Sequence, residues 1–176
     1  MIKLAITGVY LTSNNLQNIS SALRTNTVLE KLNLSGCTST PENFHHLAQM
    51  LAVNNSLTSL DLTGTDLPEE NLQQIAKSLT VNTSLQTLIM DANSLDEKEE
   101  GLQALLNAIL IANTTLTELN ISSESFSSET QKIISRLLSQ NLCLSFSELD
   151  PDFEEGNRLS MINQKRKATF LSLVQE

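Results

Sequence analysis

The chain has 176 residues, of which 40% are hydrophobic and 32 are leucine. This composition is typical of a globular protein long enough to bury a core in one domain, and no apolar run approaches the ~18 residues of a membrane span. Acidic residues outnumber basic ones by 20 to 11, and the net charge of −9 argues against nucleic acid or an anionic membrane as the main partner. Two cysteines exclude a disulfide framework.

The first residues, MIKLAITGVYL, differ from a secretory signal because Thr7 and Gly8 interrupt the apolar stretch. The Asn-x-Ser/Thr sequons along the chain then follow from its composition, which is rich in Asn, Ser and Thr. We therefore expect a protein made in a reducing cytoplasm.

A repeated block of sequence is the main feature of the chain. The blocks begin at Val28, Ser56, Ser84 and Thr115, and a step back of 28 residues places an earlier unit at Met1. An asparagine recurs in phase with them, at Asn26, Asn54, Asn82, Asn113 and Asn141. Because two markers agree in register, the sequence predicts about five units of about 28 residues.

Each unit changes its apolar period halfway along. The first half has the pattern Leu-x-x-Leu-x-Leu, in which Leu32 and Leu34 point the same way, as in a strand. The second half has helical spacing, as in Phe44, Leu47 and Leu51.

Helix boundaries are predicted from local signals. Pro41 and Pro68 mark two helix starts, and Ser94 with Glu97 fits a capping box. We expect the recurrent asparagine to end each helix, because asparagine tolerates the left-handed backbone conformation.

One strand and one helix cannot bury their apolar faces alone, so the units must stack. The predicted fold is therefore α/β: a solenoid over residues 1–141, a right-handed β-α horseshoe with a parallel sheet inside and helices outside. Residues 142–176 do not match the repeat and are predicted to form a C-terminal helical cap and tail, with a helix from Leu159 to Val174. We expect no cap before the first strand, which would leave its edge open unless it pairs or frays.

The repeat resembles the leucine-rich repeat family, specifically its ribonuclease-inhibitor-like class, whose pattern is L-x-x-L-x-L-x-x-N/C. Cys37, Thr65 and Asn93 fit the ninth position, whereas Val9 and Glu124 depart from it. The resemblance implies a horseshoe-shaped protein-binding scaffold without catalysis, and hence without a catalytic metal or cofactor.

The residues that flank the ladder leucines point out of the predicted sheet and form its concave face. This face is basic near the start of the chain and acidic towards its end. The candidate protein-binding residues are Lys31, Asn33, Asp61, Ile89, Asp91, Glu118 and Asn120. A basic partner is predicted to bind through the acidic ones, and a featureless soluble sheet face is the alternative.

A second candidate surface is an apolar patch on the fourth and fifth helices. Its members, Leu105, Ile109, Ile133 and Leu137, occupy positions that are polar or small in earlier units. The patch is expected to be covered by the tail or to bind a partner.

Few residues suggest chemistry. His45 and His46 are adjacent, so they face different directions on a helix and make poor joint ligands. Cys37 and Cys143 are interpreted as structural, because Cys37 has no basic neighbour in the sequence and Cys143 lies in an apolar segment. We therefore expect no enzymatic activity.

The favoured function is an adaptor that binds another protein, of unknown identity and with no prediction of its oligomeric state. The favoured setting is a bacterial effector delivered into a host cell. The composition differs from most vertebrate members of the class, and the C-terminal end resembles known translocation signals, with acidic residues from Glu148 to Glu155 followed by Leu173 and Val174. The alternatives are an effector of the ubiquitin-ligase type and a stand-alone regulatory repeat module.

Overall fold

Strands and helices alternate along the chain in a computed structural model, which describes residues 1–121, 126–140, 145–146 and 153–174. The elements are β1 (Ile2–Ala5), α1 (Ser13–Thr25), β2 (Leu29–Asn33), α2 (Pro41–Leu51), β3 (Ser59–Asp61), α3 (Glu69–Leu79), β4 (Thr87–Ile89), η1 (Leu95–Glu97), α4 (Glu99–Ile111), β5 (Glu118–Asn120), α5 (Ser128–Gln140), β6 (Ser145–Phe146) and α6 (Glu154–Val174).

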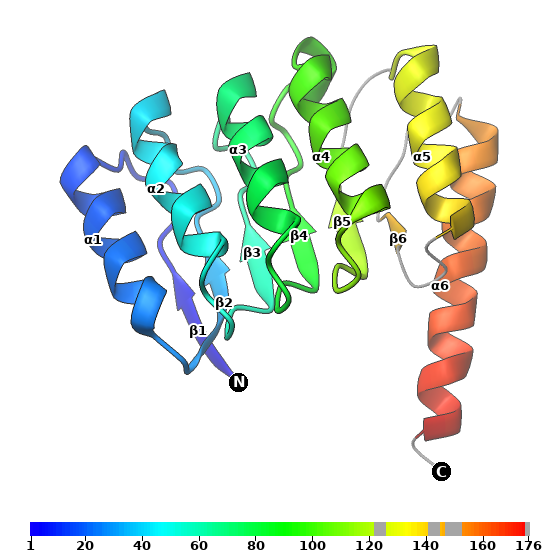
Figure 1. The fold of residues 1–176 in the computed structure, drawn as a ribbon, viewed down its shortest axis with the longest axis horizontal. Coiled ribbons are helices and arrows are strands. Elements are labelled where there is room, and N and C mark those ends of the chain that lie inside the picture. The colour runs from blue at the N-terminus through cyan, green and yellow to red at the C-terminus, as the bar shows by residue number, and fades with distance from the viewer. Residues whose placement is uncertain (122–125, 141–144, 147–152, 175–176) are drawn as a thin grey trace.

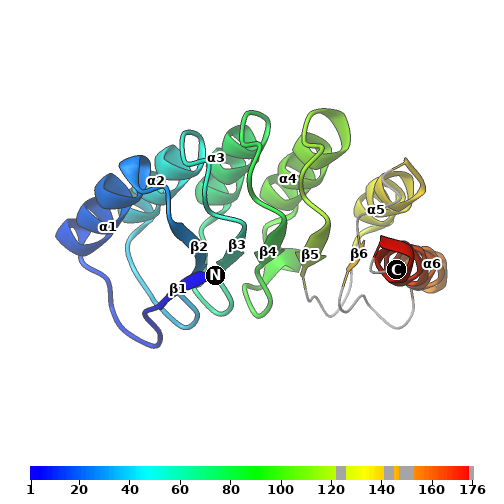
Figure 2. The same cartoon turned by 90° about the horizontal axis from the view of Figure 1, so that it is seen from below.

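The strands form one parallel sheet in the order β1-β2-β3-β4-β5-β6. Helices α1 to α5 lie side by side on one face of it, and the other face is open (Figure 1). Seen from below, after a turn of 90° about the horizontal axis, the helices follow the outside of a shallow arc and the strands follow the inside (Figure 2). The predicted α/β class, with a parallel sheet and helices on one side, is confirmed.

The core lies between the sheet and the helices. Leu32, Leu60, Leu88 and Leu119 are register partners on successive strands, and none is more than 1% exposed. Leu47 and Leu72 meet them from the helices and are also fully buried. The apolar positions of β2 to β5 and of the helices beside them therefore close one continuous core along the stack.

The recurrent asparagines stabilise the turns between helix and strand. Asn54 Nδ2 donates to the carbonyl oxygens of Leu23 (2.7 Å) and Asn26 (3.2 Å) in the preceding unit. Its Oδ1 accepts from the backbone nitrogens of Ser56 (3.0 Å) and Leu57 (2.7 Å). Asn82 and Asn113 repeat these bonds.

The prediction that these asparagines end helices by adopting the left-handed backbone conformation is wrong. Among the described residues, the non-glycine residues with positive φ are Asp66, Ala92 and Ser94, and no ladder asparagine is among them. Asparagine is used here because its side chain has both a donor and an acceptor, and can bond two turns at once.

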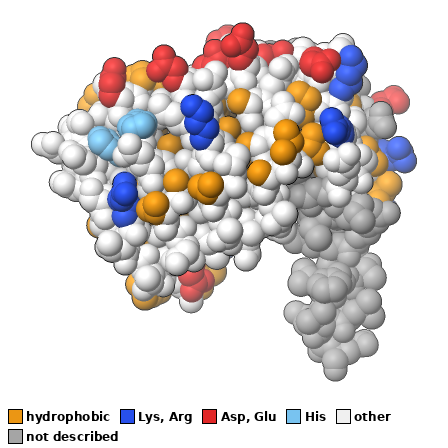
Figure 3. Space-filling model, viewed as in Figure 1, with side chains coloured by type: hydrophobic (Ala, Val, Ile, Leu, Met, Phe, Trp, Pro, Cys, Tyr) orange, Lys and Arg blue, Asp and Glu red, His pale blue; other side chains and the backbone are white. Residues whose placement is uncertain are grey.

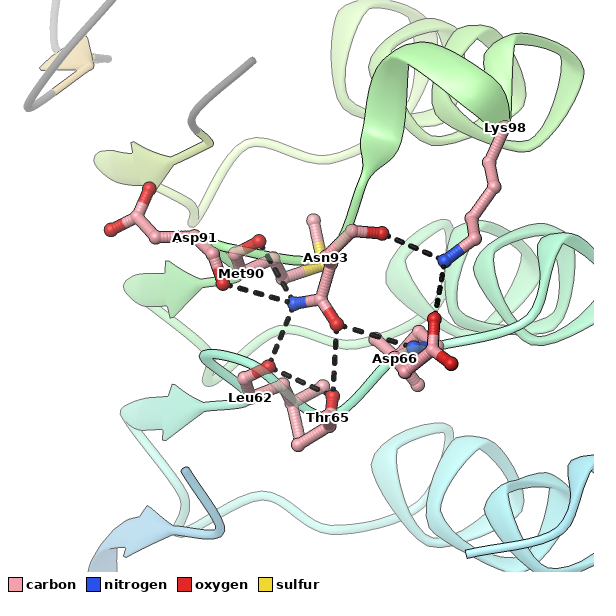
Figure 4. A network of polar contacts seen from close by, with 8 residues as sticks. Leu62, Thr65, Asp66, Met90, Asp91, Asn93 and Lys98 are labelled. Carbon is pink, nitrogen blue, oxygen red and sulfur yellow. Dashed lines mark hydrogen bonds and ion pairs between the residues drawn. The ribbon is translucent and has the colours of Figure 1, made fainter. Parts of the chain in front are cut away.

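A second set of polar contacts joins the ends of β3 and β4 to the loops that follow them. Asn93 Nδ2 donates to the carbonyl oxygens of Leu62 (2.8 Å) and Met90 (2.9 Å), and its Oδ1 accepts from Thr65 Oγ1 (3.2 Å). Lys98 Nζ donates to the carbonyl oxygen of Asn93 (2.7 Å) and pairs with Asp66 (3.0 Å) (Figure 4). Cys37, Thr65 and Asn93, which share one position of the repeat, are all buried.

The predicted helix starts are correct at α2 and α3, which begin at Pro41 and immediately after Pro68. The capping box at Ser94 is wrong, because Ser94 is left-handed and precedes the short 3-10 helix η1, while α4 begins at Glu99. A capping box forms instead at α1. There Asn15 N donates to Thr12 Oγ1 (3.3 Å), and Thr12 N donates to Asn15 Oδ1 (3.1 Å).

The C-terminal segment packs against the last repeat helix. Helix α6 begins at Glu154, five residues before the predicted start at Leu159, and lies against α5. Asn163 Nδ2 donates to the carbonyl oxygen of Leu138 on α5 (3.0 Å), and Phe153 is buried. Asn141, Cys143 and most of the acidic stretch from Glu148 to Glu155 lie outside the described residues.

Candidate binding surface

The concave face of the sheet is lined by the side chains that alternate with the ladder leucines. On β2, Leu32 is buried while Lys31 and Asn33 on either side of it are half-buried on the open face. Strand pairing aligns these side chains in two columns. They are Lys3, Lys31, Ser59, Thr87 and Glu118, and then Ala5, Asn33, Asp61, Ile89 and Asn120.

Two of the predicted binding residues are engaged within the chain. Asp61 Oδ2 accepts from Asn33 Nδ2 (2.9 Å), and Asp61 Oδ1 accepts from the backbone nitrogen (2.9 Å) and the hydroxyl (2.7 Å) of Thr63. Asn33 Oδ1 in turn accepts from the backbone nitrogen of Ser35 (2.8 Å). The Asp61 carboxylate thus stabilises the strand ends, and its charge is partly satisfied by these donors.

Apart from Lys31 on β2, the remaining candidates lie on β4, on β5 and two residues after the end of β4. Ile89 is the register partner of both Asp61 and Asn120, so it lies between these two side chains in its column. Glu118 stands beside Thr87 on the neighbouring strand, and Thr87 Oγ1 donates to Glu118 Oε2 at 3.4 Å. Asp91 follows β4 and is half-buried. This end of the face therefore combines one large apolar side chain with two carboxylates, whereas Lys31 lies towards the other end.

The second candidate surface, the apolar patch, does not exist as an exposed surface. Leu105, Ile109 and Leu137 are 0%, 2% and 0% exposed, and Ile133 is partly buried against the core. On the same helix α4, Ile111 is 81% exposed. The prediction that Leu105 and Ile109 are surplus to the repeat is therefore wrong.

An insertion explains the error. The unit that contains α4 is longer by three residues, because Asn113 follows Asn82 by 31 positions. The predicted register placed all three extra residues before the helix. In the structure, two of the extra residues are taken up before the helix, where η1 forms. The third is taken up after it, because the Asn113 nitrogen donates to Ala108, five residues back, whereas the Asn82 nitrogen donates to Ser78, four residues back. Leu105 therefore occupies on α4 the inward-facing position that Ile75 occupies on α3.

The outer, helical face carries features that the sequence patterns did not single out. Acidic side chains gather along the edge where the helices begin (Figure 3). They belong to the first turns of α2 to α5 and include Glu42, Glu69, Glu70, Glu99, Glu100 and Glu129. Negative charge at a helix N-terminus is favourable, so this row has a structural explanation.

Two of these carboxylates bond to the next helix. Glu69 Oε1 accepts from the backbone nitrogen of Gly101 (3.0 Å), and Glu99 Oε1 accepts from the backbone nitrogen of Ser127 (3.1 Å) and from Thr130 Oγ1 (3.0 Å). Hydrogen bonding, chiefly to Ser127, lowers the pKa of Glu99 from its ordinary value, against an opposing effect of burial. The pKa of Glu42 is also lowered, mainly by its own backbone N–H and then by Thr40.

Shallow hollows separate neighbouring helices on this face. The one between α3 and α4 has a volume of about 360 Å³ and is lined mainly by small side chains, including Ala76, Ala104 and Ala108, with Ile111 at its side. Another, of about 350 Å³, lies between α2 and α3. Next to it, His45 Nδ1 donates to Gln74 Oε1 (2.9 Å), and Gln49 Nε2 donates to His45 Nε2 (2.6 Å).

Neither a candidate metal site nor a candidate membrane-spanning helix is present among the described residues. No group of three or more His, Cys, Asp and Glu side chains among them could hold a metal ion. Within the same residues, no helix is long and apolar enough to span a bilayer. Cys37 is buried, and its Sγ donates to the carbonyl oxygen of Ile6 (3.1 Å).

Comparison with known proteins gives matches in structure alone. The sequence matches no family model and none of the curated proteins. A structure of leiomodin-1 actin-binding site 2 aligns with 77% of this chain and 80% of its own length, with 22% identity and a TM-score of 0.59. A tropomodulin C-terminal domain from Caenorhabditis elegans aligns with 100% of this chain and 90% of its own, with 15% identity and a TM-score of 0.67.

These matches correct the more specific identification. The chain is similar in fold to tropomodulin and leiomodin domains, which are leucine-rich-repeat-like, and the identification as a bacterial effector of the ribonuclease-inhibitor-like class is wrong. Nothing in the matches supports the ubiquitin-ligase alternative. At 15% and 22% identity, the similarity is one of fold.

Proposed function

We propose that the chain is a non-enzymatic scaffold that binds another protein through the concave face of a leucine-rich-repeat solenoid. In this proposal about five units of about 28 residues form the scaffold over residues 1–141, and residues 142–176 cap its end. The observation that carries it is the register of the open sheet face, which presents side chains from four successive strands, β2 to β5, in straight columns. Such a surface is rigid before binding, which lowers the entropy cost of recognition.

The centre of the proposed site is the acidic end of that face. Ile89 supplies the apolar contact. Glu118 supplies negative charge beside Thr87, the first residue of β4, and Asp91 supplies it beyond the last residue of that strand. Asp61 and Asn33 contribute less direct contact, because they are hydrogen-bonded to each other and to neighbouring backbone. We therefore propose a partner with a basic, partly apolar surface, steered by charge and held at Ile89.

Actin is the first partner to test. The support is the similarity in fold to leiomodin-1 actin-binding site 2. Fold similarity at this level of identity does not carry a binding site with it, so the test must locate the contact on this chain.

The experiment uses the purified chain with purified actin, in monomeric form by fluorescence anisotropy and in filamentous form by co-sedimentation. We expect binding to the wild-type chain, and a loss of affinity of roughly tenfold or more when Ile89→Asp and Glu118→Lys are combined. Glu129→Lys is the matched control, because Glu129 is an exposed carboxylate on the outer helix α5.

The results separate the two parts of the proposal. Binding that both variants retain would move the site off the concave face. Absence of binding to either form of actin would remove actin as the partner, and the same variants can then be applied to any partner found by other means.

A further inference from the structure

Helix α4 packs against α3 through small side chains. Gly101, Ala104 and Ala108 lie at i, i+3 and i+7, on one side of α4. That side faces α3, because a Cβ atom on Gly101 would lie 2.9 Å from the carbonyl oxygen of Glu69. Beyond this close approach, the two helices leave the hollow of about 360 Å³ that Ala76, Ala104 and Ala108 line.

The next pair of helices has larger residues at the equivalent positions. Thr130, Ile133 and Leu137 have the same spacing on α5, and Gln103 Nε2 of α4 donates to Thr130 Oγ1 (3.1 Å). Leu137 is fully buried, and Ile133 is partly buried against the core. The hollow between α3 and α4 therefore exists because alanine stands where the same chain elsewhere has isoleucine and leucine.

An exposed isoleucine flanks this hollow. Ile111, the last residue of α4, is among the residues that line it and is 81% exposed. Ala104 and Ala108 are half-buried, so the apolar floor is accessible from outside. We call the hollow and its flank, formed by Ala76, Ala104, Ala108 and Ile111, the α3–α4 groove. An occupant of this groove would remove both its floor and the Ile111 side chain from water.

The shape of the groove suits a helix. Its lining residues run from Gln73 to Thr80 on α3 and from Ala104 to Ala112 on α4. A helical stretch of this length spans roughly 12 Å, or about two turns. Because α3 and α4 lie side by side (Figure 1), a third helix can pack its side chains into the space between them. Apolar side chains at i, i+4 and i+7 of that helix would follow the groove.

Charges along the groove determine which helix fits. Glu70 and Glu100 are exposed carboxylates in the first turns of α3 and α4, within the acidic edge in Figure 3. Lys98 does not neutralise them, because its side chain is 15% exposed and pairs with Asp66. Lys77 is exposed and is the charged member of the residues that line the hollow. The groove thus runs from an acidic end, past one cation, to an apolar end.

We propose that the α3–α4 groove binds an amphipathic helix of a partner protein, antiparallel to α3 and α4. In this orientation the helix dipoles are aligned favourably, and the last turn of the bound helix lies beside Glu70 and Glu100. Lysine or arginine in that turn is favoured by its own helix dipole and by these two carboxylates. Large apolar side chains fill the hollow and cover Ile111, and an acidic side chain near the middle meets Lys77.

A second copy of the chain does not supply such a helix from its described residues. Among the described side chains, the large apolar ones that are exposed on a helix are Ile111 on α4 and Met161 on α6. One exposed apolar side chain on a helix does not make the stripe that the groove requires. The proposal also does not depend on the concave face, because the groove lies on the helical side of the sheet.

The test uses the full chain and two blocked, dye-labelled peptides of about 14 residues, or about 21 Å of helix. Both have leucine at i, i+4 and i+7 and glutamate in the middle, and a hydrocarbon staple keeps both helical, as circular dichroism can verify. The last turn contains lysines in one peptide and glutamates in the other. Fluorescence anisotropy should show binding of the lysine peptide, and binding of the glutamate peptide weaker by about three- to tenfold.

A pair of charge variants tests the acidic end. Glu70→Lys combined with Glu100→Lys should remove or reverse the preference for the lysine peptide. Glu42→Lys combined with Glu129→Lys is the matched control, because it changes the charge equally in the first turns of α2 and α5. The control should retain the preference, which separates a local contact from attraction to the net charge of −9.

A second pair of variants tests the apolar part. Ala104→Ile combined with Ala108→Leu fills the hollow with the residue types that α5 has at the equivalent positions, and should weaken binding of the lysine peptide by about tenfold or more. Ile111→Ser should weaken it by about threefold with little change in melting temperature, because Ile111 is exposed. If the filled variant does not fold, amide chemical shifts of the wild-type chain replace it, and those of residues 104–112 should move on addition of the lysine peptide.

Four results would overturn the proposal. The first is no binding of the lysine peptide up to about 1 mM. The second is an equal loss of preference in both charge variants. The third is unchanged binding to the filled variant, or shifts centred outside α3 and α4. The fourth is a dimer of the chain alone, seen by sedimentation, that the filled variant dissociates, which would assign the groove to a second copy.

Discussion

Asn82 Nδ2 lies 2.8 Å from the carbonyl oxygen of Leu51, the last residue of α2, which precedes it by 31 positions. The last carbonyls of a helix have no partner within the helix, and this bond satisfies one of them from the following unit. The same side chain holds the turn before β4 by accepting from the Leu85 nitrogen (2.8 Å). A buried side chain thus joins two units and shapes a turn at the same time.

Asn82→Ala should therefore destabilise the protein more than the removal of an exposed polar side chain would. It leaves the Leu51 carbonyl and the Leu85 nitrogen without their partner in a buried turn, and we expect a loss of about 1–3 kcal/mol for such groups. Urea unfolding measures the change. Asn55→Ala, at an exposed asparagine in the preceding unit, should cost about 0.5 kcal/mol or less. Equal midpoints for the two variants would contradict a structural role for the ladder.

Leu105→Ala distinguishes the observed register of α4 from the one predicted by the repeat marker. Leu105 is fully buried, so we expect a loss of roughly 2–5 kcal/mol from the cavity. Ile111→Ser on the same helix should cost about 0.5 kcal/mol or less, because Ile111 is 81% exposed. Thermal and urea unfolding of both variants provides the comparison, and the reverse order of stability would restore the predicted register.

Gly101→Ala should destabilise the protein, although alanine is favoured over glycine inside helices by roughly 0.5–1 kcal/mol. A Cβ atom at this position would lie 2.9 Å from the carbonyl oxygen of Glu69 and 3.0 Å from the Leu72 side chain. We expect a net loss of about 1–3 kcal/mol from this overpacking of α4 against α3. Ser21→Ala, on the exposed side of α1, is the control and should be neutral or slightly stabilising.

Glu99 should contribute a pH-dependent part of the stability. Its pKa is lowered in the folded state, so its contribution is fully present above the unfolded value near 4.5 and is lost as the pH falls through the folded pKa. The stability deficit of Glu99→Gln relative to wild type should be largest near neutral pH and should shrink in acid. Urea unfolding at a series of pH values measures it, with Glu100→Gln as an exposed neighbouring control. A deficit that grows in acid would show that the hydrogen bonds to Ser127 and Thr130 do not hold the ionised form.

The candidate surface could be predicted only in part. The columns that contain Lys31, Ile89 and Glu118 followed from the alternation of side chains in a strand, which depends on backbone geometry alone. The engagement of Asp61 with Asn33 and Thr63 did not follow, because those bonds depend on the spacing and orientation of neighbouring strands and loops. The asparagine ladder was visible as a pattern, but its bonds join carbonyls that lie 28 to 34 residues away.

The sequence by itself determined the period, the class of fold and the inward face of each regular unit, because leucine spacing distinguishes strand from helix and burial enforces that spacing along the whole stack. Only the tertiary structure decided how the longer unit takes up its three extra residues. Sequence markers on either side of α4 fix the total length of that unit, but they do not say whether the extra residues enter before or after the helix. Packing decided it, since the arrangement that buries Leu105 and Ile109 against the neighbouring helices leaves one apolar residue, Ile111, in solvent.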